Sequence, residues 1–137
     1  MTPEEMAEIH ARCFTAQRPW SADEFSALQA STHVFACTRE GGFALGRAIA
    51  GEAELLTIAV SPELQGRGIG RKLLESFEEA ARRQGALRAF LEVSEANHPA
   101  IALYRACGYG EAGRRCGYYR ERDGKRMDAI LMHKQLT

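Results

Sequence analysis

Glycines occupy three of the five positions in Gly66–Gly70, between an apolar strand-like stretch, Leu55–Val60, and a helical pattern. With so few side chains over the first helical turn, backbone N–H groups stay open there, and the helix dipole adds partial positive charge. Arg67, Arg71 and Lys72 add cationic side chains nearby. A helix start of this kind suits a phosphate or pyrophosphate group. The segment therefore predicts a binding site for a phosphorylated ligand.

The spacing of these glycines narrows the choice of ligand. The segment lacks G-x-G-x-x-G, so a dinucleotide-binding fold has no motif support. Gly46 and Gly51 have the separation of an ATP- or GTP-binding loop, but Glu52 follows where that loop needs a lysine. From Gln65 onward the pattern is Q-x-x-G-x-G. A glycine turn that holds no ligand remains the alternative.

Two further residues have side chains suited to proton transfer. Alternation in Ala89–Val93 places Phe90 and Glu92 on one face of a predicted strand. A carboxylate in an apolar strand is costly unless it is solvated or used in chemistry. Tyr104 lies among apolar residues of a predicted helix. A water-facing glutamate at the strand end and a core tyrosine are the alternative interpretations.

Metal chemistry and disulfides have little support. The sequence has no H-E-x-x-H motif or Cys/His cluster, so no metal site is expected. The cysteines show no C-x-x-C spacing, and without an export signal we expect them to be reduced. The histidines are scattered at His10, His33, His98 and His133.

The length and the charge of the chain indicate which class of protein it belongs to. With 137 residues, we expect one domain over residues 1–137. Basic and acidic residues balance at 18 each, which gives no general attraction to nucleic acid or membrane. No apolar run is long enough to span a bilayer, and the acidic, polar N-terminus is unlike a signal peptide. We expect a cytoplasmic monomer with no membrane partner.

The hydrophobic pattern predicts the helices and strands that would position these residues. Two capping boxes, Thr2–Glu5 and Ser21–Glu24, predict two N-terminal helices. Strands are expected over His33–Arg39, Phe43–Ala50, Ala53–Val60, Leu87–Val93, Tyr109–Tyr118 and Lys125–His133, and further helices over Gly68–Gln84 and Pro99–Cys107. This order predicts an α/β fold in which one central mixed sheet has helices on both faces.

Several motifs together resemble the GNAT superfamily of N-acetyltransferases. The Q-x-x-G-x-G turn is followed by L-E-V at Leu91–Val93, by N-x-x-A-x-x-L-Y at Asn97–Tyr104 and by G-Y at Gly108–Tyr109. The match covers about residues 52–136. Within the superfamily the chain is most similar to the ribosomal-protein-alanine N-acetyltransferases. The resemblance implies acetyl-coenzyme A as co-substrate, without a metal.

The resemblance also implies a role for individual residues. Glu92 would be the general base, acting through water, and Tyr104 the general acid that protonates the departing thiolate. The residues implied in cofactor binding are Ile58, Ala59 and Val60 for the pantetheine arm, Gly66, Arg67, Gly68, Ile69, Gly70 and Arg71 for the pyrophosphate, and Asn97, which is also a good helix N-cap. Trp20 and Tyr118 would line a peptide cleft, although Trp20 could equally be a core residue.

The implied reaction is direct attack of an amine on the thioester in a ternary complex. The implied acceptor is the N-terminal alanine of a small-subunit ribosomal protein. A GNAT enzyme for another amine (a small molecule, a lysine or an aminoacyl-tRNA) and a non-catalytic coenzyme A-binding module remain open. The segment 114–126 is basic with interleaved tyrosines. It could contact RNA, but we expect a solvated hairpin and no nucleic-acid partner.

Overall fold

The structure is a computed structural model that describes residues 1–14 and 18–137. Its elements, in chain order, are α1 (Pro3–Cys13), α2 (Ala22–Ala30), β1 (Val34–Arg39), β2 (Gly42–Ile49), β3 (Glu52–Val60), a 3-10 turn (Pro62–Leu64), α3 (Ile69–Arg83), β4 (Arg88–Ser94), α4 (His98–Ala106), β5 (Gly110–Arg120) and β6 (Arg126–Gln135). No helix among the described residues combines the length and apolar character needed to cross a membrane.

Local sequence explains where the N-terminal helices begin. Thr2 caps α1, and its hydroxyl accepts from the Glu5 N–H while the Glu5 carboxylate accepts from the Thr2 N–H. Ser21 and Glu24 repeat this exchange at the start of α2. Both predicted capping boxes are therefore confirmed, and each satisfies two backbone donors that have no partner inside the helix.

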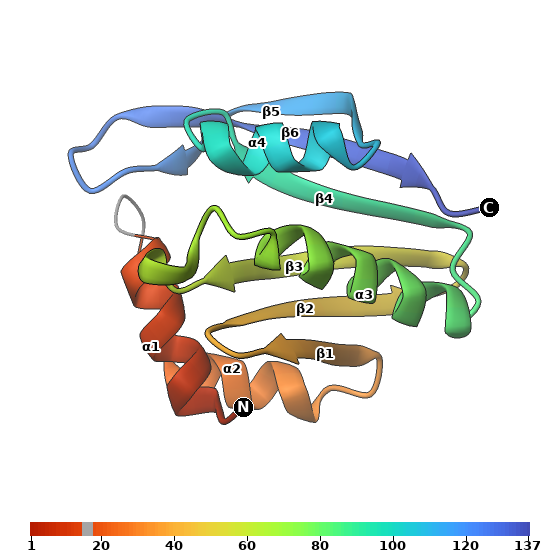
Figure 1. The fold of residues 1–137 in the computed structure, drawn as a ribbon. Coiled ribbons are helices and arrows are strands. Elements are labelled where there is room, and N and C mark those ends of the chain that lie inside the picture. Colours follow the sequence, from red (N-terminus) through yellow and green to blue (C-terminus); the bar gives the residue numbers. More distant parts are fainter. Residues whose placement is uncertain (15–17) are drawn as a thin grey trace.

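The strands form one six-stranded sheet in the order β1-β2-β3-β4-β6-β5 within the described residues. Neighbouring strands are antiparallel except β3 and β4, which are parallel. The β3–β4 register pairs run from Glu52–Arg88 to Glu54–Phe90, near the start of both strands. Beyond those pairs the two strands diverge, and Figure 1 shows them separating toward the end of the molecule where α1 lies.

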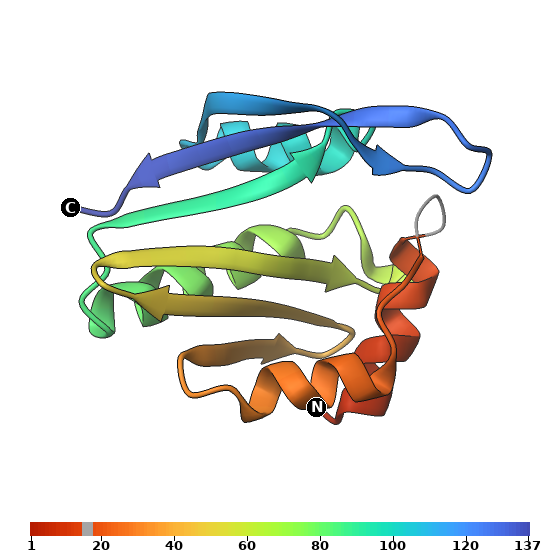
Figure 2. The ribbon, with the colours of Figure 1, turned by 180° about the vertical axis from the view of Figure 1, so that it is seen from behind.

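Helices cover both faces of the sheet, as predicted. α3 and α4 lie on the face toward the viewer in Figure 1, and α2 lies on the face toward the viewer in Figure 2. The first face carries the larger apolar cluster, which includes Leu73 and Phe77 of α3 and Tyr104 of α4. The second carries a smaller cluster of α1, α2, β2 and β3 side chains: Met6, Ile9, Phe25, Phe43, Leu45 and Ala59.

The bounds of some elements differ from the prediction for local reasons. Gly42 pairs with Arg39 and so belongs to β2, leaving a turn at Glu40 and Gly41, where Gly41 has φ 74°. Tyr109 does not begin β5, because its N–H bonds to the Tyr104 carbonyl and closes the end of α4.

Candidate functional site

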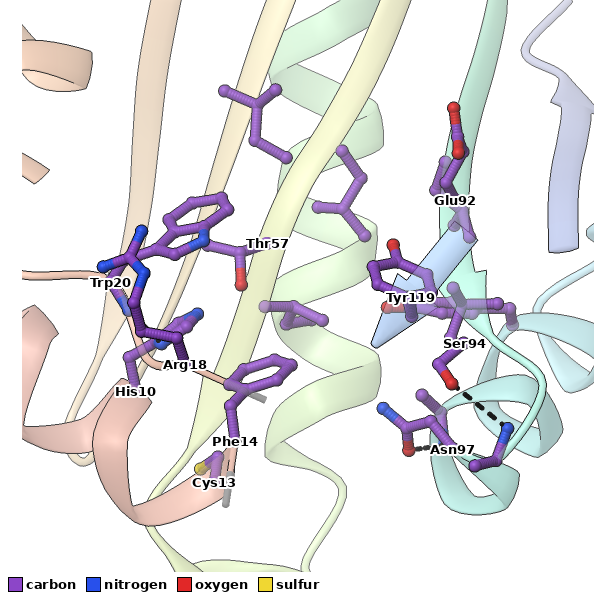
Figure 3. Close-up of a pocket in the computed structure, with 18 of the residues that line it drawn as sticks. His10, Cys13, Phe14, Arg18, Trp20, Thr57, Glu92, Ser94, Asn97 and Tyr119 are labelled. Atoms are coloured by element: carbon purple, nitrogen blue, oxygen red, sulfur yellow. Dashed lines mark hydrogen bonds between the residues drawn. The ribbon is translucent and has the colours of Figure 1, made fainter. Parts of the chain in front are cut away.

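A cavity of about 330 Å³ lies where β3 and β4 diverge. One wall comes from α1 and Trp20, and the other from β4, the start of α4 and Tyr119 of β5. Figure 3 shows His10, Phe14 and Trp20 facing Glu92, Asn97 and Tyr119 across it. Residues 55–58 of β3 line the cavity between these walls. The cavity therefore gathers segments from almost the whole chain.

Glu92 lines this cavity from β4. The burial pattern of β4 alternates, with Leu91 and Val93 buried and Glu92 partly exposed, as the sequence predicts. Its Oε1 lies 3.0 Å from Nη2 of Arg115 on β5, and 22% of its side chain is exposed. Glu92 also lines a second hollow, together with residues of β3, β4, β5 and β6. Glu92 thus borders both the cavity and this second hollow.

Tyr104 reaches the cavity from α4. The residue is 6% exposed and belongs to the main apolar cluster, but it also lines the cavity. Burial, with a smaller contribution from the charge of Tyr119, raises the pKa of the Tyr104 phenol above its ordinary value. The hydroxyl therefore stays protonated at neutral pH and can act as a donor. The structure places Glu92 and Tyr104 along the same cavity.

Asn97 both caps α4 and lines the cavity. Its Oδ1 accepts from the Ala100 N–H at 3.3 Å, so the side chain satisfies one of the open donors of the first turn. The predicted N-cap is confirmed.

The glycine turn opens α3 as predicted. Gly66 and Gly68 have φ of 80° and 81°, a left-handed conformation that favours glycine, and Gly68 is the N-cap of α3. A Cβ added at Gly66 or Gly68 would meet no atom within 4 Å, whereas one at Gly70 would lie 3.4 Å from Leu103. The first turn of the helix is thus open at its N-terminal end.

The remaining predicted cofactor residues lie around that end. Ile58 lines the cavity, while Ala59, Val60 and the range 66–71 lie outside its described lining. Since β3 pairs with β4 only near its start, the edge of β3 that faces β4 has no strand partner among the described residues beyond Glu54. Arg71 pairs with Glu75 one helical turn away at 3.5 Å.

Of the two predicted cleft residues, only Trp20 lines the cavity. Tyr118 is 53% exposed and lies outside the described lining, whereas its neighbour Tyr119 is in it. β5 is irregular between Arg115 and Tyr119, because this four-residue step pairs with the two-residue step from Ala129 to Met127 on β6, and Gly117 has φ 59°. Tyr119, which pairs with Met127, is the tyrosine of this segment that lines the cavity.

Sequence reasoning missed other residues of the cavity wall. His10, Cys13 and Phe14 line the cavity from the end of α1. The four-residue spacing of Met6, His10 and Phe14, which places them on one helical face, was the available signal. The Cys13 thiol donates to the Val60 carbonyl at 3.1 Å, and burial raises its pKa. Cys13 is thus a protonated thiol that ties α1 to the end of β3.

Some basic side chains of the segment 114–126 make contacts within the protein. Arg114 pairs with Glu95, Glu111 and Asp128, and Arg126 donates to the Gly117 carbonyl. Among residues 1–14 and 18–137, no group of three or more His, Cys, Asp or Glu side chains is placed to hold a metal ion.

The chain is similar to several known proteins. Residues 4–109 match the sequence profile of the acetyltransferase (GNAT) family. The chain is 40% identical over 118 residues to the [ribosomal protein bS18]-alanine N-acetyltransferase of Escherichia coli K12, covering 83% of this chain and 79% of that protein. It is 40% identical over 123 residues to the N-alpha-acetyltransferase RimI of Mycobacterium tuberculosis, covering 83% and 76%.

The structure is also similar to a solved one. The crystal structure of the ribosomal-protein-S18-alanine N-acetyltransferase from Escherichia coli superimposes with a TM-score of 0.85 at 35% identity, covering 98% of this chain and 88% of that one.

Proposed function

Because this chain belongs to the GNAT acetyltransferase family, we propose that it acetylates the N-terminal α-amine of a protein, with acetyl-coenzyme A as donor. The proposed acceptor is the N-terminal alanine of ribosomal protein bS18, on which the Escherichia coli relative acts. The proposed domain spans residues 1–137 and acts in the cytoplasm. The observation that carries the chemistry is that Glu92 and Tyr104, a carboxylate and a protonated phenol, line one cavity.

The residues around the start of α3 fit a coenzyme A pyrophosphate. The open turn at Gly66 and Gly68 leaves room for backbone N–H groups to approach phosphate oxygens, and Arg67 and Arg71 add positive charge. The edge of β3 over Ile58–Val60 has no strand partner among the described residues and can hydrogen-bond an extended pantetheine arm as an added strand would. The Val60 carbonyl already accepts from the Cys13 thiol, so the arm would use the other groups of this edge. The remaining proposed contacts come from Ile69, Gly70 and Asn97.

Glu92 and Tyr104 would divide the proton transfers between them. An α-amine has an ordinary pKa of about 7.7–8.0, against about 10.4 for lysine, so a carboxylate acting through water is a sufficient base near neutral pH. Glu92 takes the proton that the attacking amine loses. The C–N bond forms as the C–S bond breaks, and Tyr104 gives its proton to the leaving thiolate. Trp20 and Tyr119, on opposite walls, would hold the acceptor peptide.

The test measures thiol release from acetyl-coenzyme A with three acceptors. One is a peptide with the N-terminal sequence of bS18, the second is the same peptide with a blocked N-terminus and an added lysine, and the third is a polyamine. We expect release with the first alone. Preference for the lysine peptide or the polyamine would instead indicate a GNAT enzyme for another amine. Coenzyme A binding without release from any acceptor would indicate a non-catalytic module.

A Glu92→Gln variant tests the mechanism in the same assay. We expect acetylation of the bS18 peptide to slow by about 10²–10⁴-fold, the usual range for a general base. The defect should shrink as pH rises past the pKa of the amine, because deprotonation then needs no help. A defect of constant size across pH would contradict the base role.

A further inference from the structure

His10 is a buried imidazole that the proposed mechanism does not use. It lies on α1, is 3% exposed and lines the cavity. Its Nδ1 accepts a hydrogen bond from the backbone N–H of Trp20 at 3.2 Å. Since Nδ1 is an acceptor, the neutral ring carries its proton on Nε2. The bond joins α1 to the residue just before the capping box of α2.

The same imidazole lies between two aromatic rings. Its centroid is 4.1 Å from that of Phe14 and 5.1 Å from that of Trp20, with both rings near parallel to it. Phe25 of α2 meets the imidazole edge-on at 5.5 Å. His10 therefore contacts Trp20 in two ways: it accepts a hydrogen bond from the Trp20 backbone N–H, and it stacks on the Trp20 ring.

This stack forms the cavity wall opposite the candidate base. In Figure 3, His10, Phe14 and Trp20 lie on one side, while Glu92 and Tyr119 lie on the other. Burial lowers the pKa of His10, so the ring stays uncharged at neutral pH. An acceptor whose amine lies near Glu92 would place its first residue in the space that Trp20 bounds. The position of Trp20 then decides how well that residue fits.

We propose that His10 is a positioning residue for the acceptor, fixing Trp20 as the wall against which the N-terminal residue of the peptide packs. The inference rests on the proposed function. It requires that His10 affect acceptor binding through Trp20, and neither the donor nor the chemical step.

Two substitutions separate the hydrogen bond from the stacking. His10→Phe keeps a flat ring but leaves the Trp20 N–H without its acceptor, a loss that is costly in a partly buried site. His10→Asn removes the ring but offers an amide oxygen near the position of Nδ1. We expect His10→Phe to raise the KM for the bS18 peptide about tenfold. kcat and the KM for acetyl-coenzyme A should stay within about twofold of wild type, and His10→Asn should restore part of the peptide KM.

Trp20 provides a direct spectroscopic readout, because it is the single tryptophan of the chain. Its fluorescence emission should shift in His10→Phe and return toward the wild-type position in His10→Asn. Ile9→Ala is the matched control. Ile9 adjoins His10 on α1 and belongs to the apolar cluster against which Trp20 packs, but it lies outside the described lining of the cavity. The control should lose thermal stability while keeping the peptide KM and the Trp20 emission.

The outcomes separate this inference from the proposed function. A wild-type peptide KM and unchanged emission in His10→Phe, in an enzyme that acetylates the bS18 peptide, would overturn the positioning role alone. An equal rise in peptide KM in Ile9→Ala would also overturn it, because general loosening of α1 would then explain the effect. A wild-type enzyme that acetylates no peptide N-terminus would refute the proposed function, and this inference with it.

Discussion

Arg115 on β5 holds its guanidinium 3.0 Å from the carboxylate of Glu92 on β4. The two strands are not neighbours, since β6 lies between them. The guanidinium also lies 5.0 Å from the centre of the Tyr118 ring, within cation–π range. Tyr118, although it lies outside the described lining of the cavity, thus contacts the partner of the candidate base. Arg115 is thus placed to orient the Glu92 carboxylate.

Replacing Arg115 should therefore impair the reaction through Glu92. We expect Arg115→Met to lower kcat about tenfold, within the range of coupling found for residues in contact. In a Glu92→Gln background the same change should have almost no effect, because the carboxylate it orients is gone. Steady-state kinetics of the two single variants and the double variant measure this coupling. Additive losses would mean that Arg115 acts independently of Glu92.

Arg114→Met is the matched control for this cycle. Arg114 adjoins Arg115, but its ion pairs are with Glu95, Glu111 and Asp128. We expect a kcat close to wild type in this variant.

A substitution at Gly70 tests whether the glycine turn at the start of α3 binds the cofactor. Gly66 and Gly68 have positive φ, so a side chain there strains the backbone, whereas Gly70 lies inside α3 and its added Cβ would meet Leu103 at 3.4 Å. We expect Gly70→Val to fold but to lose most of the thermal stabilisation by acetyl-coenzyme A, because its branches narrow the approach to the turn. Thermal unfolding with and without the ligand measures this, since a ligand at 100 times its Kd adds about 2.7 kcal/mol.

Gly110→Val is the control for the turn. Gly110 begins β5, and a Cβ there would meet nothing within 4 Å. This variant should keep the full ligand-induced shift. An equal shift in Gly70→Val would contradict a coenzyme site at the start of α3.

Local signals predicted the parts of the site that depend on neighbours in sequence. The glycine spacing indicated the open start of α3, and alternation placed Glu92 on the partly exposed side of β4. Asn97 was recognisable as a cap because its bond to Ala100 spans three residues. The mixed sheet followed from the order of the elements.

Long-range contacts could not be predicted in this way. Tyr119 lines the cavity and Tyr118 lies outside its described lining, in a part of β5 that is irregular near Gly117, whose N–H donates to Asp128 of β6 at 2.9 Å. Alternation along β5 alone gives no sign of that contact. The partnership of Arg115 with Glu92 depends on the order β4-β6-β5, which hydrophobic periodicity does not specify.

The burial of His10 predicts a pH dependence of stability. Burial lowers its pKa from 6.5 to about 4, while the charge of Glu24 opposes the shift. Between these values the unfolded chain binds a proton that the folded protein does not, so the free energy of unfolding falls as pH drops from about 6.5 toward 4. The contribution of one group is at most about 1.4 kcal/mol per pH unit. Denaturant unfolding at several pH values measures it.

His10→Phe serves as the comparison for this pH dependence. We expect the variant to be less stable than wild type at pH 7. Its stability should fall less steeply between pH 6.5 and 4.5, because its core has no imidazole to protonate. Equal slopes in the two proteins would show that other groups govern the acid sensitivity.

Tyr104 and Tyr109 should respond in opposite ways to removal of their hydroxyl groups. The Tyr109 hydroxyl donates to the buried carboxylate of Glu78 at 2.9 Å, while Tyr104 lines the cavity. We expect Tyr104→Phe to lower kcat about 10²-fold, within the general-acid range, with little change in melting temperature. A donor with a more acidic thiol should reduce that defect, because a better leaving group needs less protonation. Tyr109→Phe should lower the melting temperature and leave kcat near wild type. A wild-type kcat in Tyr104→Phe would show that the Tyr104 hydroxyl is not the general acid and that this tyrosine only packs in the core.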